Sequence, residues 1–489
     1  MKTFFKQYSQ FAVVIILSLI QFYSSKAADQ TELDEAITGL WQTTLEENGS
    51  TLIFILEIET TVTDSLKCTI HVPEFGMSNL PYGNFLLQDD SIKLPGFEAI
   101  LINNTIKGRF GVLGIPLDIE FSKIKEKPEF TINCPEKDPD WEIETGGAIW
   151  SSPTIYENQL LFGNDLGSFY SINIKDKSTT WTFECDGAIH SKAGVTDHGI
   201  CFGSDDGYLY MIESGTGKLK WKVDVGNAAS PRIGPAKEGS KYDFLCSSPT
   251  IEGDMIYIGS KDSILYAINV DNGSILWEYK TEGIIRSTPA VDKGMVYFGS
   301  WDHYMYALDR ENGSLVWKYD AGLGIQSSPL VVDDMVVFGS RAASVFAVNK
   351  ETGKEIWKTR YWGSWVESSP VYYENKIYVG SSDFRKVVAL EPSNGKVIMS
   401  TRVEGWAWPT PAITEEFIFT GTIGSLDYME NMHGIFYAFE RKTGKPVWQF
   451  KMEDDPNVFA YGFASSSEVW NDWVFVGGLD GKMYGMKVK

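Results

Sequence analysis

The sequence lacks the short motifs by which several enzyme classes are recognised. It contains no Gly-x-Ser-x-Gly nucleophile elbow, no His-Glu-x-x-His zinc motif and no Cys-x-x-Cys-His haem-attachment motif. The five histidines are scattered along the chain rather than spaced like metal ligands. These absences argue against a hydrolase with a nucleophile elbow, a zinc-dependent protease and a c-type haem protein.

Cysteine is scarce, because the 489 residues include only five. They are Cys68, Cys134, Cys185, Cys201 and Cys246. An odd number leaves at least one thiol free, even if the chain is exported to an oxidising compartment. A Cys68–Cys134 disulfide would join the N-terminal region to the segment that follows it, but the sequence leaves the pairing open.

Basic residues are outnumbered, with 43 Lys and Arg against 65 Asp and Glu and a formal net charge of -22. A surface of this sign repels phosphate backbones, so no nucleic-acid partner is expected. The simplest interpretation of the charge is that it keeps the protein soluble.

Long apolar runs are missing except at the N-terminus. Lys2 and Lys6 precede an apolar stretch over Phe11–Phe22, and Ser25-Lys26-Ala27 offers small residues for cleavage. This pattern predicts a signal peptide over residues 1–27 and a periplasmic or secreted protein. The apolar stretch is too short to span a bilayer comfortably, and no cysteine follows the cut for a lipid anchor. We therefore expect no transmembrane segment.

A repeat dominates the rest of the chain. A proline or small residue is followed, nine positions later, by a residue that is apolar in all but one copy and then by glycine. Successive copies are 40 or 41 residues apart, with two steps of 56. The eight anchors are Pro153, Ala193, Pro249, Pro289, Pro329, Pro370, Pro411 and Ser467. A period near 40 in a β-rich chain indicates a repeat architecture, here with eight units.

Each unit predicts four antiparallel strands. Three short apolar runs are separated by turn residues, and an Asn-Gly or Thr-Gly turn such as Asn312-Gly313 precedes a fourth. Repeated radially, four-stranded units form an all-β, eight-bladed β-propeller. Tryptophans recur at one position of the fourth strand, where we expect a structural role: Trp141, Trp181, Trp221, Trp277, Trp317, Trp357 and Trp448.

The last copy ends at its third strand, and its missing strand is found before the first copy. Trp141 precedes Ser151 by ten residues, as Trp317 precedes Ser327. Residues 139–146 are therefore predicted to supply the outer strand of the eighth blade and to close the ring.

The pattern Ala-x-Asp/Asn-x-x-Thr/Asn-Gly-x-x-x-Trp recurs in register at Ala267–Trp277, Ala307–Trp317 and Ala347–Trp357 and, with Glu440, at Ala438–Trp448. It resembles the tryptophan-docking repeat of the PQQ-like (pyrroloquinoline-quinone) propellers, and the resemblance covers residues 139–489. That family includes quinoprotein dehydrogenases and non-catalytic periplasmic scaffolds of outer-membrane protein assembly. The resemblance implies an eight-bladed propeller with one of these two kinds of function.

A separate unit precedes the propeller. Residues 32–123 contain alternating apolar runs that predict a small antiparallel β-barrel or sandwich. Gly39-Leu-Trp41 resembles the Gly-x-Trp of lipocalins, and the arrangement is also similar to a β-module that precedes some secreted hydrolases. Residues 124–138 are polar, contain proline and are predicted to be a linker.

Three insertions interrupt the 40-residue period. They lie within Asn227–Phe244, Ile423–Gly434 and Glu453–Gly462. In a propeller, the loops that join strand two to three and strand four to the next blade open on the same face. The insertions therefore predict a working face on that rim.

The same face holds the residue before each Ser-Ser-Pro-like triplet. In turn these are Trp150, His190, Cys246, Arg286, Gln326, Glu367, Trp408 and Ala464. Six of them, namely Trp150, His190, Arg286, Gln326, Glu367 and Trp408, are hypothesised to bind a ligand, because indoles stack and charges pair with polar groups. The alternative is that any propeller channel must be lined by some side chains.

The function predicted from these observations is an exported, non-catalytic scaffold. It would bind a protein partner, or a small polar or carbohydrate ligand, as a monomer without a cofactor. One alternative is a PQQ- and calcium-dependent dehydrogenase, in which Glu367 would be a calcium ligand, although no matching Asn and Asp lie at the same level. The other alternative is a polysaccharide-binding protein.

Deleting residues 480–489 should unfold the propeller rather than trim a tail, because these residues complete the closing blade. Thermal denaturation measures the effect, and a truncated chain with unchanged stability would refute ring closure.

Overall fold

The computed structural model describes residues 30–61, 65–85, 91–94, 97–102, 104–112, 115–128, 132–226, 246–426 and 432–488. The chain divides into two compact units, one up to Thr131 and one from Ile132, with Asn48–Ser50 grouped with the second. The predicted signal peptide lies outside the described residues. Within them, no helix is long and apolar enough to cross a membrane.

The first unit is an antiparallel sheet of eight strands in up-and-down order. Its sheet order is β4-β3-β2-β1-β8-β7-β6-β5, and β4 and β5 at the two ends of this order also contact each other. The barrel is therefore nearly closed. Its elements are α2 (Gln30–Ile37), β1 (Gly39–Glu47), β2 (Ser50–Thr60), β3 (Leu66–Val72), η1 (Pro73–Phe75), β4 (Met77–Phe85), β5 (Ser91–Leu94), β6 (Phe97–Ile102), β7 (Thr105–Val112) and β8 (Ile115–Ile124).

The Gly-x-Trp motif anchors the start of this barrel. Trp41 is fully buried, and its Nε1–H donates to the carbonyl of Ile37 at 2.6 Å, which ties helix α2 to β1. The Lys123 ammonium lies 5.2 Å from the indole centroid and so joins the last strand to the first through a cation–π contact. Deeper in the barrel, Phe97 and Phe121 meet edge to face at 5.9 Å.

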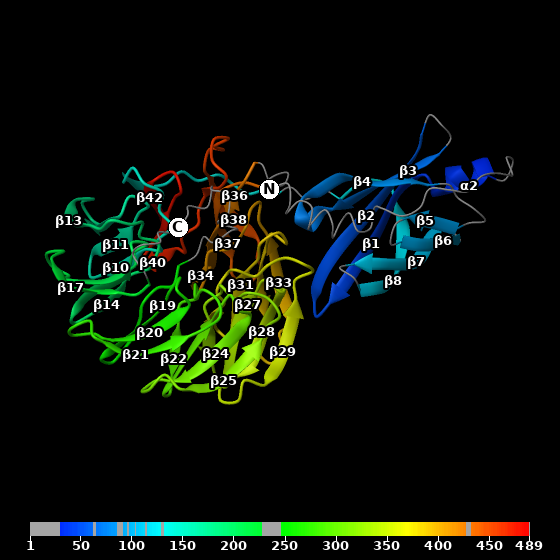
Figure 1. Cartoon of the computed structure of the whole chain (residues 1–489). Coiled ribbons are helices and arrows are strands. Elements are labelled where there is room, and N and C mark those ends of the chain that lie inside the picture. The colour runs from blue at the N-terminus through cyan, green and yellow to red at the C-terminus, as the bar shows by residue number, and fades with distance from the viewer. Residues whose placement is uncertain are drawn as a thin grey trace. The chain divides into compact units, whose positions relative to one another are not determined.

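The second unit is the predicted eight-bladed propeller, with four antiparallel strands in each blade. Figure 1 shows the blades following one another, for example β19-β20-β21 and β22-β24-β25. Blade 1 consists of β10 (Thr154–Tyr156), β11 (Gln159–Gly163), β12 (Ser168–Asn173) and β13 (Thr179–Glu184), and blade 2 consists of β14 (Gly194–Thr196), β15 (Gly199–Gly203), β16 (Tyr208–Ile212) and β17 (Leu219–Asp224). Blade 3 consists of β18 (Thr250–Glu252), β19 (Met255–Gly259), β20 (Ile264–Asn269) and β21 (Ile275–Lys280), and blade 4 consists of β22 (Ala290–Asp292), β23 (Met295–Gly299), β24 (Tyr304–Asp309) and β25 (Leu315–Asp320).

The remaining blades have the same antiparallel order. Blade 5 consists of β26 (Leu330–Val332), β27 (Met335–Ser340), β28 (Ser344–Asn349) and β29 (Glu355–Arg360), and blade 6 consists of β30 (Val371–Tyr373), β31 (Lys376–Gly380), β32 (Lys386–Leu390) and β33 (Val397–Arg402). Blade 7 consists of β34 (Ala412–Ile413), β35 (Phe417–Gly421), β37 (Ile435–Glu440) and β38 (Pro446–Lys451), and blade 8 consists of β40 (Glu468–Trp470), β41 (Trp473–Gly477), β42 (Lys482–Lys487) and β9 (Trp141–Glu144). Two further short strands, β36 (Ile423–Gly424) and β39 (Tyr461–Gly462), pair with each other outside the blades.

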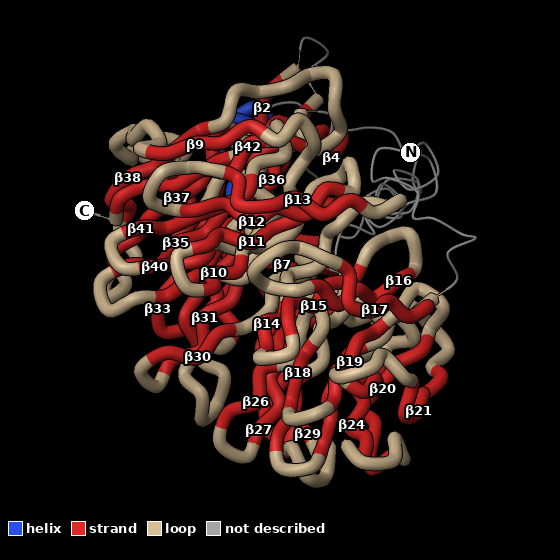
Figure 2. Tube along the Cα trace, turned by 90° about the vertical axis from the view of Figure 1, so that its left-hand side faces the viewer, coloured by secondary structure: helices blue, strands red, loops and turns tan. Residues whose placement is uncertain are grey.

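The ring closes as the tryptophan spacing predicts. Strand β9 pairs antiparallel with β42, with Trp141 opposite Gly485 and Glu144 opposite Lys482, and the two run side by side in Figure 2. The Lys487 N–H also donates to Asp140 Oδ2 at 2.8 Å. The eighth blade is thus built from both ends of the propeller sequence, which leaves no unfinished blade.

The recurring tryptophans join each blade to the next. The Trp317 Nε1–H donates to the carbonyl of Lys350 in blade 5 at 2.9 Å, and the same ring lies against Gly353. Gly353 has φ +67, and a Cβ there would lie 2.8 Å from the indole. The turn glycine is therefore required twice, for its backbone conformation and for the close approach of the ring. Equivalent Nε1–H bonds are made by Trp181, Trp221, Trp277 and Trp357.

Two blade junctions vary this contact. In blade 6 Met399 replaces the tryptophan and packs against Gly444 of blade 7, with Sδ 3.2 Å from a Cβ built at that glycine. In blade 1 Lys177 takes the glycine position at φ +63, and its ammonium lies 5.8 Å from the Trp141 ring. Within the described residues, Nε1 of Trp141 and of Trp448 has no acceptor. These two indoles belong to blades 8 and 7, so both lie at the closing blade.

The Ser-Ser-Pro triplet links the inner strands. The first serine joins two segments of its own blade, since Ser327 Oγ accepts a hydrogen bond from the Gly339 N–H at 3.1 Å. The second serine holds the neighbouring blade, since the Ser328 N–H donates to Ser369 Oγ at 2.9 Å. Further hydroxyl acceptors in this inter-blade series are Ser248, Thr288, Ser328, Ser466 and Ser152.

Residues 132–137 do more than link the two units. The Gln449 N–H of β38 donates to the Pro135 carbonyl, and the Lys137 N–H donates to the Gln449 carbonyl, each at 2.8 Å. Glu136 and Gln449 form a parallel bridge, so this half of the predicted linker adds to the outer edge of blade 7. Ile132 packs against the core shared by blades 6 and 7.

Cys68 and Cys134 are both free thiols, so the Cys68–Cys134 disulfide that the sequence allowed is not formed. Burial raises the pKa of the Cys68 thiol to about 12 and of Cys134 to about 11. Burial also raises the pKa of Cys185 to about 11. Because the thiolate is the reactive form, these three cysteines are poor nucleophiles at neutral pH.

Replacing Gly353 by alanine should lower the free energy of unfolding by about 2–4 kcal/mol, because a positive φ and an overlap with Trp317 both oppose a Cβ. Gly215→Ala is the matched control, because a Cβ there meets nothing within 4 Å, and it should change stability by less than about 0.5 kcal/mol. Urea denaturation of both variants measures the difference, and equal midpoints would contradict the docking role of the turn glycine.

Candidate functional site

Two of the three predicted insertions meet on one face of the propeller. Strand β36 from the second insertion pairs antiparallel with β39 from the third, with Ile423 opposite Gly462 and Gly424 opposite Tyr461. The Trp406 N–H and carbonyl also bond to Ile423, which adds a third backbone segment. The first insertion, Asn227–Phe244, lies outside the described residues.

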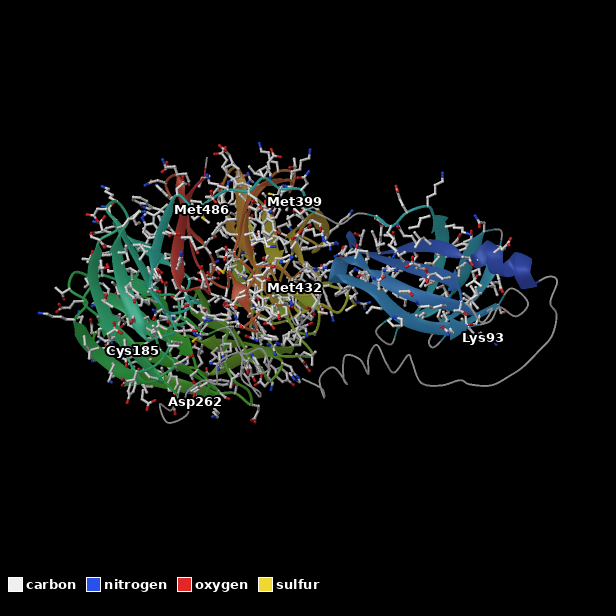
Figure 3. The ribbon with its side chains drawn as sticks, turned by 90° about the horizontal axis from the view of Figure 1, so that it is seen from above. Lys93, Cys185, Asp262, Met399, Met432 and Met486 are labelled. Carbon is white, nitrogen blue, oxygen red and sulfur yellow. The ribbon has the colours of Figure 1, made fainter. Side chains whose placement is uncertain are left out.

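Side chains hold the two insertions together. The Tyr461 hydroxyl lies 2.9 Å from Asp454 Oδ1 and 3.0 Å from the carbonyl of Met432. Figure 3 labels Met432 in the propeller. His433 Nδ1 lies 3.1 Å from the same Asp454 oxygen. Burial opposes ionisation of Asp454, but the hydrogen bonds from Tyr461 and His433 outweigh it and lower the pKa of this carboxyl.

An aromatic cluster lies beneath these insertions. The Trp406 and Trp408 rings stack with centroids 4.9 Å apart at an interplanar angle of 8°, and Phe459 from the third insertion lies 6.3 Å from Trp406. The Trp406 Nε1–H donates to Asp383 Oδ1 at 3.0 Å, which orients the stack. We call this set the mouth cluster; its buried members are Trp150, Trp406, Trp408, Ile423, Met432 and Ala464.

The structure buries five of the six residues that the sequence proposed as ligand-binding, and it leaves the sixth, His190, half-buried. Exposed fractions are 1% for Glu367, 3% for Gln326 and 6% for Arg286. Trp150 and Trp408 come together in the mouth cluster, whereas His190 and Glu367 have partners from neighbouring blades. The ligand-binding role of the six residues stays a prediction, and a ligand that used them would have to reach side chains covered by the protein itself.

A second ring of residues, which sequence reasoning overlooked, supplies these partners. It consists of the residue after the Gly-Ser or equivalent pair that ends strand two: Asp165, Asp205, Lys261, Trp301, Arg341, Ser382, Ile423 and Leu479. The Arg341 N–H donates to the Gly324 carbonyl at 3.0 Å, and this contact places Arg341 beside the segment that leads into the inner strand of its own blade. The sequence could have identified this second ring, because the residue type at this position varies from blade to blade whereas the neighbouring positions recur.

Arg341 is the centre of a stacked group on this face. Its guanidinium lies 4.4 Å from the Trp301 ring and 4.3 Å from the Trp365 ring. Its Nε lies 2.6 Å from Glu367 Oε1. Glu367 therefore pairs with Arg341 of the preceding blade.

His190 lies at the junction of blades 1 and 2. Its Nε2 is 2.5 Å from Asp165 Oδ1 and its Nδ1 is 3.5 Å from Asp205 Oδ2. The Trp150 ring lies 5.8 Å away, so this polar group borders the mouth cluster. Each ring nitrogen of His190 therefore faces a carboxylate oxygen.

The described residues do not fit a calcium-bound quinone. No three His, Cys, Asp or Glu side chains among them lie close enough to hold a metal ion. Glu367, the calcium ligand that the sequence offered, is buried against Arg341. Trp406 and Trp408 are stacked on each other and are themselves buried in the mouth cluster.

Arg341→Ala should destabilise the propeller by about 3 kcal/mol at pH 7, because it leaves the Glu367 carboxylate buried without its counter-charge. Arg109→Ala is the control, since the Arg109–Asp118 pair is exposed at 68% and 81% and is worth less than about 1 kcal/mol. Urea denaturation of both variants measures the effect, and a midpoint for Arg341→Ala as high as that of Arg109→Ala would contradict the stabilising pair.

A known protein family matches this chain. The family model described as outer membrane protein assembly factor BamB matches residues 205–364 and 341–489. No curated protein matches the sequence.

Solved structures share the fold. BamB from Moraxella catarrhalis is 17% identical, with a TM-score of 0.54 over 72% of this chain and 99% of that one. A europium-containing methanol dehydrogenase is 13% identical, with a TM-score of 0.53 over 70% and 85%. The quinohemoprotein alcohol dehydrogenase from Comamonas testosteroni is 12% identical, with a TM-score of 0.55 over 72% and 76%. At these identities the likeness concerns the fold alone. Because the family model matches more than half of the sequence, the chain belongs to the outer membrane protein assembly factor BamB family of PQQ-like propellers.

Proposed function

We propose that this protein is an exported scaffold that holds a protein partner on the face formed by its paired insertions. The observation that carries the proposal is the mouth cluster together with the exposed apolar side chains beside it. Leu166 is 66% exposed, and Leu426 and Val458 are each 43% exposed. Large apolar side chains exposed around an aromatic core are typical of protein-binding surfaces.

Each of these side chains belongs to a segment that contacts the cluster. Val458 precedes Phe459, which packs on Trp406. Leu426 follows Ile423 on the second insertion. Leu166 lies over Gly147, where a Cβ would approach its Cγ to 2.7 Å, and the adjacent Ala148 packs against the cluster. The rigid cluster thus fixes the positions of the exposed side chains, which reduces the entropy lost on binding.

A protein partner fits this surface better than a small ligand. The polar side chains that would orient a sugar or other small molecule are buried and paired, as Glu367 is with Arg341. The exposed apolar side chains lie in loops beside exposed polar residues such as Glu453 and Asn457. A broad partner surface can cover this mixed surface without displacing the protein's own contacts. The name of the family, an assembly factor, is consistent with a role in holding another protein.

Export and a periplasmic location belong to the same proposal. They rest on the signal-peptide pattern of residues 1–27 and on the outer-membrane description of the family. The formal charge of -22 is compatible with a freely diffusing scaffold.

Site-specific photo-crosslinking in the native cells tests this proposal. A photoreactive residue at Leu166, Leu426 or Val458 should give the same discrete adduct with a partner protein. A photoreactive residue at Ile100, which is also 43% exposed but lies on the N-terminal barrel, should not. Leu166→Asp combined with Val458→Asp should reduce the adduct at Leu426 at least about tenfold, because a buried interfacial charge opposes docking.

Two patterns of adducts would contradict the proposal. If the three face positions give no adduct, or if Ile100 gives the same adduct in equal yield, the insertion face is not the docking surface. A glycan array with the purified protein checks the polysaccharide alternative, and specific glycan binding that Trp408→Ala abolishes would favour it instead.

A further inference from the structure

The fourth strand of most blades is the outer edge of its sheet, and blade 7 shows what such an edge can accept. There the segment around Glu136 runs parallel to β38. It uses only the N–H and carbonyl of Gln449, which bond to Pro135 and Lys137 at 2.8 Å. The propeller therefore binds one extended segment of its own chain by adding a strand to a blade.

The same backbone groups face outward in blades 3 and 4. Gln449 lies opposite Tyr437 across the last strand pair of blade 7. In the same register Glu278 lies opposite Tyr266, and Lys318 lies opposite Tyr306. Because alternate residues of an edge strand direct their N–H and carbonyl away from the sheet, Glu278 and Lys318 repeat the arrangement of Gln449. Both residues are exposed, whereas Gln449 is half-buried.

The side chains that precede these positions are apolar and exposed. Strand β21 begins with Ile275 and Leu276, at 43% and 46% exposure, and β25 begins with Leu315 and Val316, at 45% and 49%. Soluble proteins usually protect edge strands with proline or inward charge at such places. Blade 1 has Thr179 and Thr180 there, and blade 7 has Pro446 before Val447. Blades 3 and 4 therefore present two neighbouring edges that combine open backbone groups with apolar side chains.

We propose that the outer edges of β21 and β25 bind an extended, apolar segment of a partner protein by parallel strand addition. The occupant is a β-forming peptide whose backbone bonds to Glu278 or Lys318 and whose apolar side chains cover Leu276 or Val316. Backbone bonding supplies affinity that depends little on sequence, and the apolar pair selects segments with apolar residues. This surface is distinct from the insertion face and does not depend on the function proposed for it.

Replacement of the edge residues by proline tests the backbone contact directly. The probe is a fluorescein-labelled synthetic peptide, Lys-Thr-Val-Thr-Val-Thr-Val-Lys, and fluorescence anisotropy measures its binding to the full chain. Glu278→Pro with Lys318→Pro removes the two outward N–H donors, and proline is tolerated on an edge whose N–H faces solvent. Glu278→Ala with Lys318→Ala is the matched control, because it removes the same side chains and keeps both donors.

The parent and the alanine variant should bind the probe within twofold of each other, and the proline variant should bind roughly tenfold more weakly. Hydrogen–deuterium exchange of the parent should slow over residues 275–280 and 315–320 when the probe is added. If the proline variant does not fold, the double variant Leu276→Lys with Val316→Lys is used in its place. Because both side chains are exposed, these substitutions should weaken binding of the probe by a similar factor and leave the thermal midpoint unchanged.

Four results would overturn the proposal. One is a parent chain that does not bind the probe. Another is a proline variant that binds as tightly as the alanine variant, or exchange protection that falls outside both edges. The last is a dimer that the parent chain forms without the probe and the proline variant does not form, as measured by light scattering. A second copy of this chain would then occupy the edges.

Discussion

The contact between each blade tryptophan and the turn glycine of the next blade is the constraint on which the propeller depends. Trp317 lies on Gly353 and donates to Lys350, so one side chain joins two sheets by packing and by a hydrogen bond. A sheet of four strands cannot bury both faces alone, and repeating this contact around the ring supplies each blade with a neighbour. The hydroxyl series near Ser328 and Ser369 performs the same task at the inner strands.

This regular frame explains why the irregular positions matter. Loops on one face can vary because the tryptophan and serine contacts hold the blades without them. In this chain two insertions have paired through β36 and β39 and hold Phe459 against the Trp406–Trp408 stack. Polar residues on the same face are paired with one another across blade junctions, as in Arg341–Glu367 and His190–Asp165. The face is thus a preformed, largely self-satisfied surface, which suits holding a partner better than binding a cofactor.

Much of the fold could be predicted from the sequence, and much of the site could not. The spacing of Trp141 from Ser151 was sufficient to place β9 in the last blade, because repeats in register share one geometry. The same periodicity identified the ring that contains Glu367 but not its partner. Arg341 belongs to another strand of another blade, and its stacking between Trp301 and Trp365 depends on how neighbouring loops approach. Likewise, the polar composition of residues 132–137 indicated a linker, although their backbone adds to β38.

The sequence by itself determined the number of blades, the strand order and the closure of the ring, because each follows from local turn chemistry repeated at a fixed interval. Only the tertiary structure decided which polar groups meet, which aromatic residues are covered and which blade edges are open. Those properties depend on contacts between loops far apart in the sequence, as between Arg341 and Glu367 or between His433 and Asp454. No local pattern encodes such contacts, because they result from the packing of all eight blades at once.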